Sequence, residues 1–103
     1  MSYVVKILTP AEADTVDAAL WYDAQLPGLG ADFMSEVNLA AERLALNPEI
    51  YSVSFADVRR ASVHRFKFYG VYYLVRGMEV WVFAVFHGSR HPRWLMERRT
   101  EIG

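Results

Sequence analysis

The sequence predicts an α+β fold in which a helical hairpin packs on a mostly antiparallel sheet, in the order β-α-α-β-β-β. Two amphipathic helical patterns lie in the first half of the 103 residues, separated by a short break that contains Pro and Gly. After an initial strand-like segment at the N-terminus, β-type alternation returns from Ser52 onward. Hydrophobic residues make up 53% of the chain, enough for one modest core, so we expect a single domain over residues 1–103.

The first strand and helix are predicted from adjacent patterns. Residues 2–8 alternate and are rich in β-branched side chains, which indicates a strand that joins the sheet. Thr9 as N-cap and Glu12 as its capping-box partner predict a helix from there to about Gln25. Trp21 and Tyr22 on this helix are expected either in the core or at the rim of a groove. The expected apolar stripe consists of Ala13, Val16, Leu20 and Ala24.

A second helix is predicted over about residues 31–46, after the break at residues 26–30. Asp32 lies in its first turn, where the helix dipole favours an acid. Asn47 and Pro48 end it as C-cap and stop. Its apolar stripe consists of Phe33, Val37, Ala40, Ala41 and Leu44.

The rest of the chain is predicted to form the sheet and a short terminal helix. Val53, Phe55 and Val58 indicate a short strand, and residues 62–76 alternate as one long strand. Residues 76–79 predict a hairpin turn with Gly77 at positive φ. Residues 80–86 are apolar on both faces, as expected of a central strand. Pro92 then begins a basic C-terminal helix.

The net charge of −1 conceals an uneven distribution along the chain. Residues 1–58 hold two basic and nine acidic side chains, whereas residues 59–103 hold nine basic and three acidic ones. This split predicts a basic face for an anionic partner, or two halves that neutralise each other in the fold. The lack of Cys, of a signal-peptide pattern and of an apolar run near ~20 residues leads us to expect a cytoplasmic protein that does not enter the membrane.

Several chemistries are not expected from this sequence. It contains no Cys nucleophile, no Gly-rich phosphate loop and no GxSxG elbow, and its acidic residues lie mainly on predicted helix faces. His87 and His91 would share one helix face only if Gly88 and Pro92 allowed a continuous helix, so we expect no metal. No cofactor is expected either. The remaining candidates are six cations that a neighbouring pair of strands could bring together to bind phosphate, stabilise charge in RNA cleavage, or receive an acidic partner segment: Arg59, Arg60, Arg65, Lys67, Arg90 and Arg93.

The order and spacing of several short segments carry a family resemblance over nearly the whole chain. These segments are VKILTPAEAD at 5–14, Tyr22-Asp23, Gly30-Ala31-Asp32-Phe33, Leu46-Asn47-Pro48, Val58-Arg59-Arg60, Tyr72-Tyr73, and VWVFAVFHGSRHP at 80–92. The chain thereby resembles the RelE/ParE superfamily of bacterial toxins from type II toxin–antitoxin modules. The resemblance implies the same fold as the pattern analysis and a partner antitoxin that wraps the toxin.

The resemblance leaves two targets open. RelE-like toxins are similar to ribosome-dependent mRNA endoribonucleases, and for that branch the implied catalytic residues are Arg65, Lys67, Arg90 and His87. The C-terminal Tyr that this branch often carries is absent, since no Tyr follows Tyr73. ParE-like toxins act on DNA gyrase without doing chemistry.

Residues 86–94 look closer to the ParE branch, which often has His-x-x-Arg-Asp-Pro followed by Trp. This chain departs from that pattern at His91, where Asp is usual, and in its Phe-Lys-Phe-Tyr segment at 66–69, where Phe-Pro-Tyr is common. A toxin that has lost its activity and persists as a binding component is a third reading. The leading interpretation is a ParE-like gyrase inhibitor. Its antitoxin is expected to sit in the groove formed by the helical hairpin and the sheet, anchored at Trp21 and Tyr22. Its target-binding face is expected to consist of Arg59, Arg60, Arg90, Arg93 and Trp94.

Overall fold

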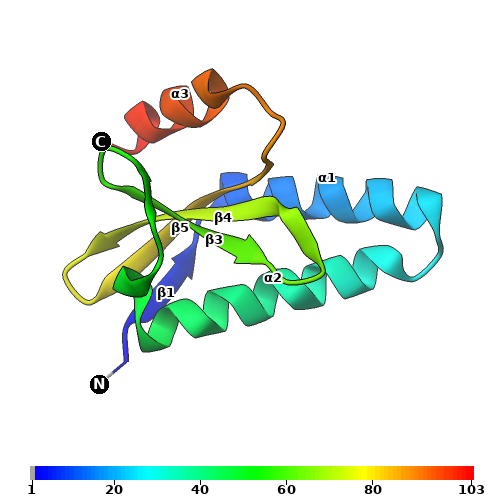
Figure 1. The fold of residues 1–103 in the computed structure, drawn as a ribbon, viewed down its shortest axis with the longest axis horizontal. Helices are drawn as coiled ribbons and strands as arrows, with labels where there is room; N and C mark the ends of the chain where they lie inside the picture. Colours follow the sequence, from blue (N-terminus) through cyan, green and yellow to red (C-terminus); the bar gives the residue numbers. More distant parts are fainter. Residues whose placement is uncertain (1) are drawn as a thin grey trace.

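The helices and strands follow the predicted order, with one more strand than the pattern indicated (Figure 1). The computed structural model describes residues 2–103. Its elements are β1 (Val4–Ile7), α1 (Thr9–Gln25), α2 (Leu29–Leu46), the 3₁₀ helix η1 (Pro48–Ile50), β2 (Val53–Phe55), β3 (Val58–Val63), β4 (Phe66–Arg76), β5 (Glu79–His87) and α3 (Pro92–Ile102). Within residues 2–103, no helix combines the length and apolar composition that a membrane span requires.

The five strands form one sheet in the order β1-β5-β4-β3-β2. β1 runs parallel to β5, whereas every other pair of neighbours is antiparallel. The predicted α+β class and the mostly antiparallel sheet are therefore confirmed, and β5 is an interior strand as expected. Figure 1 shows α1 and α2 as an antiparallel hairpin along one side of the sheet and α3 on the other side.

Side chains of β4 alternate between two apolar clusters, one on each face of the sheet. Val71 and Tyr73 pack with Phe33 and the helical hairpin, whereas Tyr72 and Leu74 pack with the cluster that α3 covers. All five predicted stripe residues of α2 are buried, which confirms that prediction. Burial of one large apolar side chain contributes about 1.5–3 kcal/mol, so these two faces are what fix the helices to the sheet.

The predicted single strand over residues 62–76 is wrong, because it contains a turn. β3 ends at Val63, β4 begins at Phe66, and Arg65 in the turn has a φ of 70°. The predicted short strand over residues 53–58 is likewise divided by a turn in which Ala56 has a φ of 47°. Gly is the residue that usually marks such angles in a sequence, and neither turn contains one.

α1 differs from the prediction at its first turn. The helix begins at Thr9 itself, and its N-cap is Leu8, with no side-chain capping bond among the described residues. The backbone N–H groups of Ala11 and Glu12 donate to the Leu8 carbonyl at 3.0 and 3.1 Å. The predicted capping box of Thr9 and Glu12 does not form, because the strand runs directly into the helix.

The buried face of α1 also differs from the predicted stripe. Ala13, Val16, Leu20 and Ala24 are all exposed, whereas the buried residues are Ala11, Thr15, Ala18 and Ala19. Small side chains let α1 approach α2 so closely that a Cβ on Gly30 would lie 2.3 Å from the Ala19 carbonyl oxygen. The apolar stripe that looked like core therefore faces outward.

Candidate functional site

Two ion pairs hold the C-terminal helix α3 in place. Arg98 pairs with Asp14 of α1, and the same carboxylate accepts the backbone N–H of Val85 at 2.9 Å. Arg99 donates two hydrogen bonds to Asp57 at 3.0 and 2.8 Å, and these hold the pKa of the Asp57 carboxyl below its ordinary value. These pairs fix the C-terminal half of α3 to α1 and to the β2–β3 turn.

Three of the predicted target-binding residues lie in the segment where β5 leads into α3, and two of them, Arg90 and Trp94, are in contact. The Arg90 guanidinium lies 4.5 Å from the ring centroid of Phe86 and 5.7 Å from that of Trp94. Trp94 is 49% exposed, and within residues 2–103 the only ion pair of Arg93 is a long one of 3.8 Å with Glu97. Arg stacked on aromatic faces keeps its hydrogen-bond donors available. We call Arg90, Arg93 and Trp94 the α3 cationic group.

The two His residues beside this group shape the loop. His87 Nδ1 accepts the backbone N–H of Ser89 at 3.0 Å, and the His87 ring stacks on Phe68 with a centroid separation of 5.8 Å. His91 is the N-cap of α3, since its Nδ1 accepts the N–H of Arg93 at 3.1 Å. His91 thus makes the side-chain cap for which Asp is an ordinary choice, so this departure from the expected pattern leaves the helix start intact.

Arg59 does not belong to the α3 cationic group. Its guanidinium donates to the carbonyls of Glu49 at 3.0 Å and of Tyr51 at 2.6 Å. Its register partner Tyr73 donates to the carbonyl of Pro48, and burial raises the pKa of Tyr73 to about 12. Both side chains fix η1 to the sheet, so Arg59 holds the fold together.

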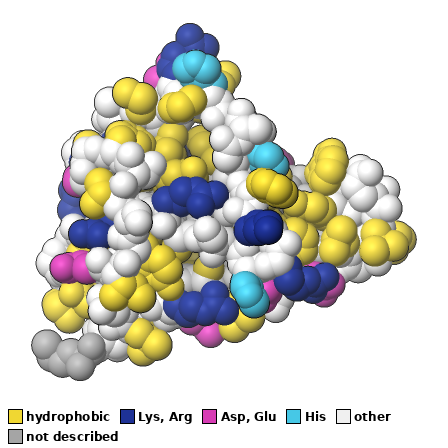
Figure 2. Space-filling model, in the orientation of Figure 1, with side chains coloured by type: hydrophobic (Ala, Val, Ile, Leu, Met, Phe, Trp, Pro, Cys, Tyr) yellow, Lys and Arg dark blue, Asp and Glu magenta, His cyan; other side chains and the backbone are white. Residues whose placement is uncertain are grey.

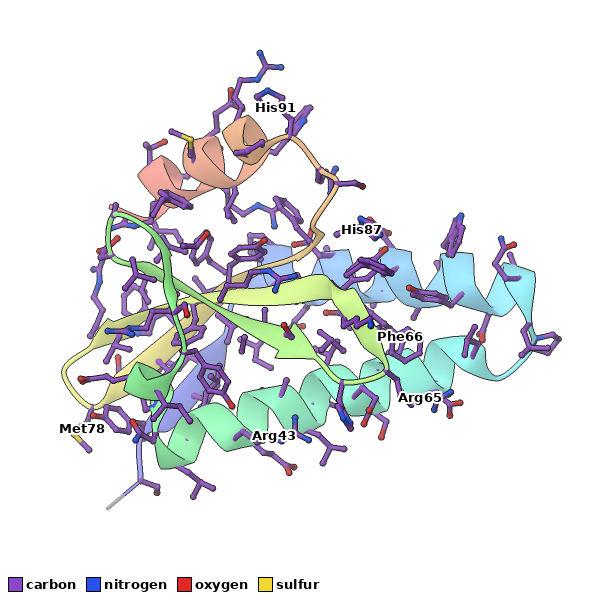
Figure 3. The ribbon with its side chains drawn as sticks, in the orientation of Figure 1. Arg43, Arg65, Phe66, Met78, His87 and His91 are labelled. Atoms are coloured by element: carbon purple, nitrogen blue, oxygen red, sulfur yellow. The ribbon has the colours of Figure 1, made fainter. Side chains whose placement is uncertain are left out.

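Arg60, Arg65 and Lys67 lie around a different hollow, so the six predicted cations do not converge. Arg65 at the β3–β4 turn pairs with Asp32 of α2 at 3.3 Å. Arg60, Arg65 and Lys67 line one hollow, whereas His87 and Arg90 line two others. The residues implied for a ribonuclease are therefore divided between two places, and Figure 3 shows Arg65 at the β3–β4 turn apart from His87.

Of the two predicted antitoxin anchors, only Trp21 is well exposed. Tyr22 packs among Phe33, Phe66 and Tyr69, with ring centroids 5.3, 4.9 and 6.0 Å away, and burial raises its pKa. Trp21 is 58% exposed and meets the edge of Tyr22 at 5.1 Å. Trp21 lines a hollow of about 390 Å³ with His87 and Arg90, on the flank of α1 toward β5.

A hollow between the helical hairpin and the sheet lies on the other flank of α1, where the antitoxin's groove was expected, but its apolar border was not predicted. Val16 and Met34 border a hollow of about 160 Å³ between α1 and α2, with Val71 and Val85 of the sheet also lining it. Leu20, one turn beyond Val16, is 64% exposed. Leu20 does not line the hollow, but it lies four residues after Val16 on the same side of α1. We call Val16 and Met34, which border the hollow, and the neighbouring Leu20 the hairpin groove. The sequence held a signal for this exposed apolar stripe. Residues 11, 15, 18 and 19 form a second helical set on α1, and their smaller side chains suit close helix packing.

The family of the chain follows from its sequence match. A family model described as ParE toxin of type II toxin–antitoxin system, parDE, matches residues 5–92. The chain belongs to the ParE toxin family. The match ends at the first residue of α3, so it includes Arg90 of the α3 cationic group, whereas Arg93 and Trp94 lie beyond it.

The fold of this ParE toxin agrees with a solved relative. It matches a chain of the chromosomal ParDE TA system from P. aeruginosa with a TM-score of 0.73 at 15% identity. The alignment covers 82% of this chain and 95% of that chain. At this identity the likeness shows the shared fold alone. No curated protein sequence matches the chain.

Proposed function

We propose that this ParE toxin inhibits DNA gyrase by binding it, without catalysing a reaction, and that the α3 cationic group lies on the contact surface. Membership of the family supports the toxin role. The observation that carries the choice of surface is the exposed stack of Arg90 on Trp94, since Arg and Trp are enriched among residues that dominate interfaces. The proposal places the protein in the bacterial cytoplasm, where gyrase acts.

Growth of a bacterial strain that lacks the antitoxin tests this surface. Arg90→Gln and Trp94→Ala are expected to relieve growth inhibition by the expressed toxin, because each removes one member of the stack. Lys6→Gln is the matched control, since Lys6 pairs with Glu79 at the β1–β5 edge and loses the same charge. Full toxicity of both stack variants, with folding confirmed by circular dichroism, would remove the α3 cationic group from the proposal.

Point substitutions test this contact surface more specifically than removal of α3 does. Residues 92–103 include Leu95, which is buried against Tyr72, Phe83 and Phe86, so a truncated chain would expose these side chains to water. Loss of toxicity on truncation would then report unfolding as much as loss of contact.

We propose further that the cognate antitoxin covers the outer side of α1, with apolar side chains seated in the hairpin groove. Val16, Leu20 and Met34 are large apolar residues that the fold leaves 46%, 64% and 40% exposed. A groove between two helices with apolar walls suits an amphipathic partner helix. Trp21 lies on the opposite flank of α1 and is packed against Tyr22, so an antitoxin that crosses the outer side of α1 would contact both flanks.

Binding of the antitoxin by variants of the groove tests its seat. Leu20→Lys is expected to weaken the complex by at least about tenfold, because it places a charge where an apolar anchor would be desolvated. Trp94→Ala serves as the control, since it alters a large exposed side chain on α3. Titration calorimetry with the purified antitoxin would contradict the proposal if Leu20→Lys bound as the parent chain does and Trp94→Ala did not.

A further inference from the structure

A wide hollow beside the β3–β4 turn carries an excess of positive charge that the proposed gyrase and antitoxin surfaces do not use. Its volume is about 710 Å³, and none of its lining residues is Asp or Glu. Figure 2 shows Lys and Arg side chains across the middle of this face, with Asp and Glu side chains nearer its margin. We call it the basic hollow; its polar lining includes Arg43, Arg60, Arg65, Lys67, Ser52 and Ser62.

Most of these cations are not neutralised within residues 2–103. Arg43 and Lys67 take part in none of the ion pairs or side-chain hydrogen bonds there. Arg60 bonds neutral groups, and only Arg65 has a carboxylate partner, Asp32, in an exposed pair of 3.3 Å. Exposed pairs of this kind are weak, so the hollow keeps a net attraction for anions.

Arg60 is held in position across the sheet. Its Nε donates to the Tyr72 hydroxyl at 3.2 Å, and its Nη1 donates to Ser62 Oγ at 3.1 Å. The side chain passes over Gly70, where a Cβ would lie 2.3 Å from the Arg60 Nε. Gly70 therefore provides the space that lets this guanidinium lie flat beside the hollow.

An exposed aromatic platform adjoins the cations. Phe68, next to Lys67, is 66% exposed and stacks on the ring of His87 at 5.8 Å with an interplanar angle of 22°. The Phe68 carbonyl accepts from Arg60 at 3.5 Å, which links the platform to the basic hollow. A row of cations beside an exposed aromatic face is the arrangement that proteins use to bind single strands, whose phosphates and bases alternate. An acidic peptide would match the cations but would not need an aromatic face beside them.

We propose that the basic hollow binds the phosphodiester backbone of a single-stranded nucleic acid, with one unpaired base stacked on Phe68. Arg60 and Lys67 contact successive phosphates, and Arg43 extends the positive surface toward α2 (Figure 3). The site binds and does not cleave. Its cations Arg43, Arg60 and Lys67 line a different hollow from Arg90, whereas Phe68 adjoins the α3 cationic group through His87. Substitutions of Arg43 and Lys67 therefore test this site separately from gyrase binding.

Fluorescence anisotropy with the full chain tests this site, using labelled oligothymidylate, oligouridylate and a duplex of about 12 nucleotides. The single strands are expected to bind more tightly than the duplex. Phe68→Ala should weaken them by about 5- to 150-fold, the range for loss of one stacking contact. Lys67→Gln and Arg43→Gln should each lower the salt dependence of log K by about 0.7 per lost phosphate contact.

Two further variants distinguish a specific binding site from nonspecific electrostatic attraction of the nucleic acid. Gly70→Ala leaves the charge unchanged but displaces Arg60, and it should weaken binding while the fold, checked by circular dichroism, persists. Lys6→Gln removes one charge far from the hollow and should leave binding unchanged. Equal losses in Lys6→Gln and Lys67→Gln, an unaffected Phe68→Ala variant, or displacement of the strand by polyglutamate at equal charge would each overturn the proposal.

Tighter binding of oligouridylate than of oligothymidylate would assign RNA as the natural strand, and the reverse order would assign DNA. An oligonucleotide that is recovered intact supports binding without cleavage. A shortened oligonucleotide would contradict the proposal that the site does not cleave. Gyrase inhibition by the same variants is measured in parallel. If Lys67→Gln loses nucleic-acid binding but still inhibits gyrase, the two surfaces act independently.

Discussion

Consecutive residues on one strand can have opposite roles, and Arg59 and Arg60 are an example. Arg59 points to the side where η1 lies and bonds two backbone carbonyls, whereas Arg60 crosses the other face over Gly70. Side chains alternate along a strand, so two adjacent Arg must diverge. The sequence alone could not show which one faced a ligand, because that depends on η1 covering one side of β3.

Replacement of Arg59 by Ala should destabilise the protein without touching its binding surfaces. The change leaves the carbonyls of Glu49 and Tyr51 without their charged donor, so we expect a loss of about 1–3 kcal/mol in the free energy of unfolding. Urea denaturation followed by circular dichroism measures it. Arg93→Ala, an exposed control, should change stability by less than about 0.5 kcal/mol; equal effects would contradict the assignment.

At the scale of elements, α2 and β5 were predictable because their patterns had one interpretation. α2 carries a single apolar stripe, and β5 is apolar on both faces as an interior strand must be. α1 carries two periodic sets, and the larger residues, Val16 and Leu20, looked like the core set. The fold buries the small set instead, because α1 must lie close to both α2 and β5.

Gly30→Ala tests the close contact between the two helices. The added Cβ would lie 2.3 Å from the backbone oxygen of Ala19 and 2.8 Å from the Asp23 carboxylate, so α1 and α2 must separate. The expected cost is about 1–3 kcal/mol in the free energy of unfolding. Thermal and urea denaturation report it, and an unchanged midpoint in both would show that the hairpin is looser than described.

The stability that the Asp57–Arg99 pair contributes by anchoring α3 should depend on pH. Its pKa is lowered from the ordinary 3.8 by hydrogen bonds from Arg99. A carboxyl whose folded pKa lies below its unfolded value stabilises the protein above the unfolded pKa, and this contribution is lost as pH falls through the folded one.

Asp57→Asn is therefore expected to lower stability at pH 7 by at most about 1 kcal/mol, as an exposed pair allows, and by nothing measurable near pH 2. Urea midpoints of the parent and the variant at the two pH values provide the comparison. Asp17→Asn on the exposed side of α1 is the control. A deficit of the Asp57 variant that persisted unchanged in acid would show that the pair is not its cause.

At the scale of the whole molecule, the uneven charge along the chain gives some ion pairs between the two halves and two separate basic surfaces. Three ion pairs join acids of the first half to Arg of the second, at Asp14, Asp32 and Asp57, which is the mutual neutralisation considered from the sequence. Of the remaining cations, Arg90 and Arg93 belong to the α3 cationic group and Arg43, Arg60 and Lys67 to the basic hollow. The fold class and the family resemblance were predictable from order and spacing, while this division was not, since it depends on the two turns without Gly at Ala56 and Arg65.

The proposed action of the toxin on gyrase depends on the α3 cationic group. The most direct measurement is DNA supercoiling by purified gyrase with the parent toxin, Arg90→Gln and Lys6→Gln, alongside translation of a defined mRNA read by primer extension. We predict that the parent and Lys6→Gln inhibit supercoiling, that Arg90→Gln does not, and that the mRNA stays intact. New cuts in the mRNA with uninhibited gyrase would contradict the account and make the protein a ribonuclease.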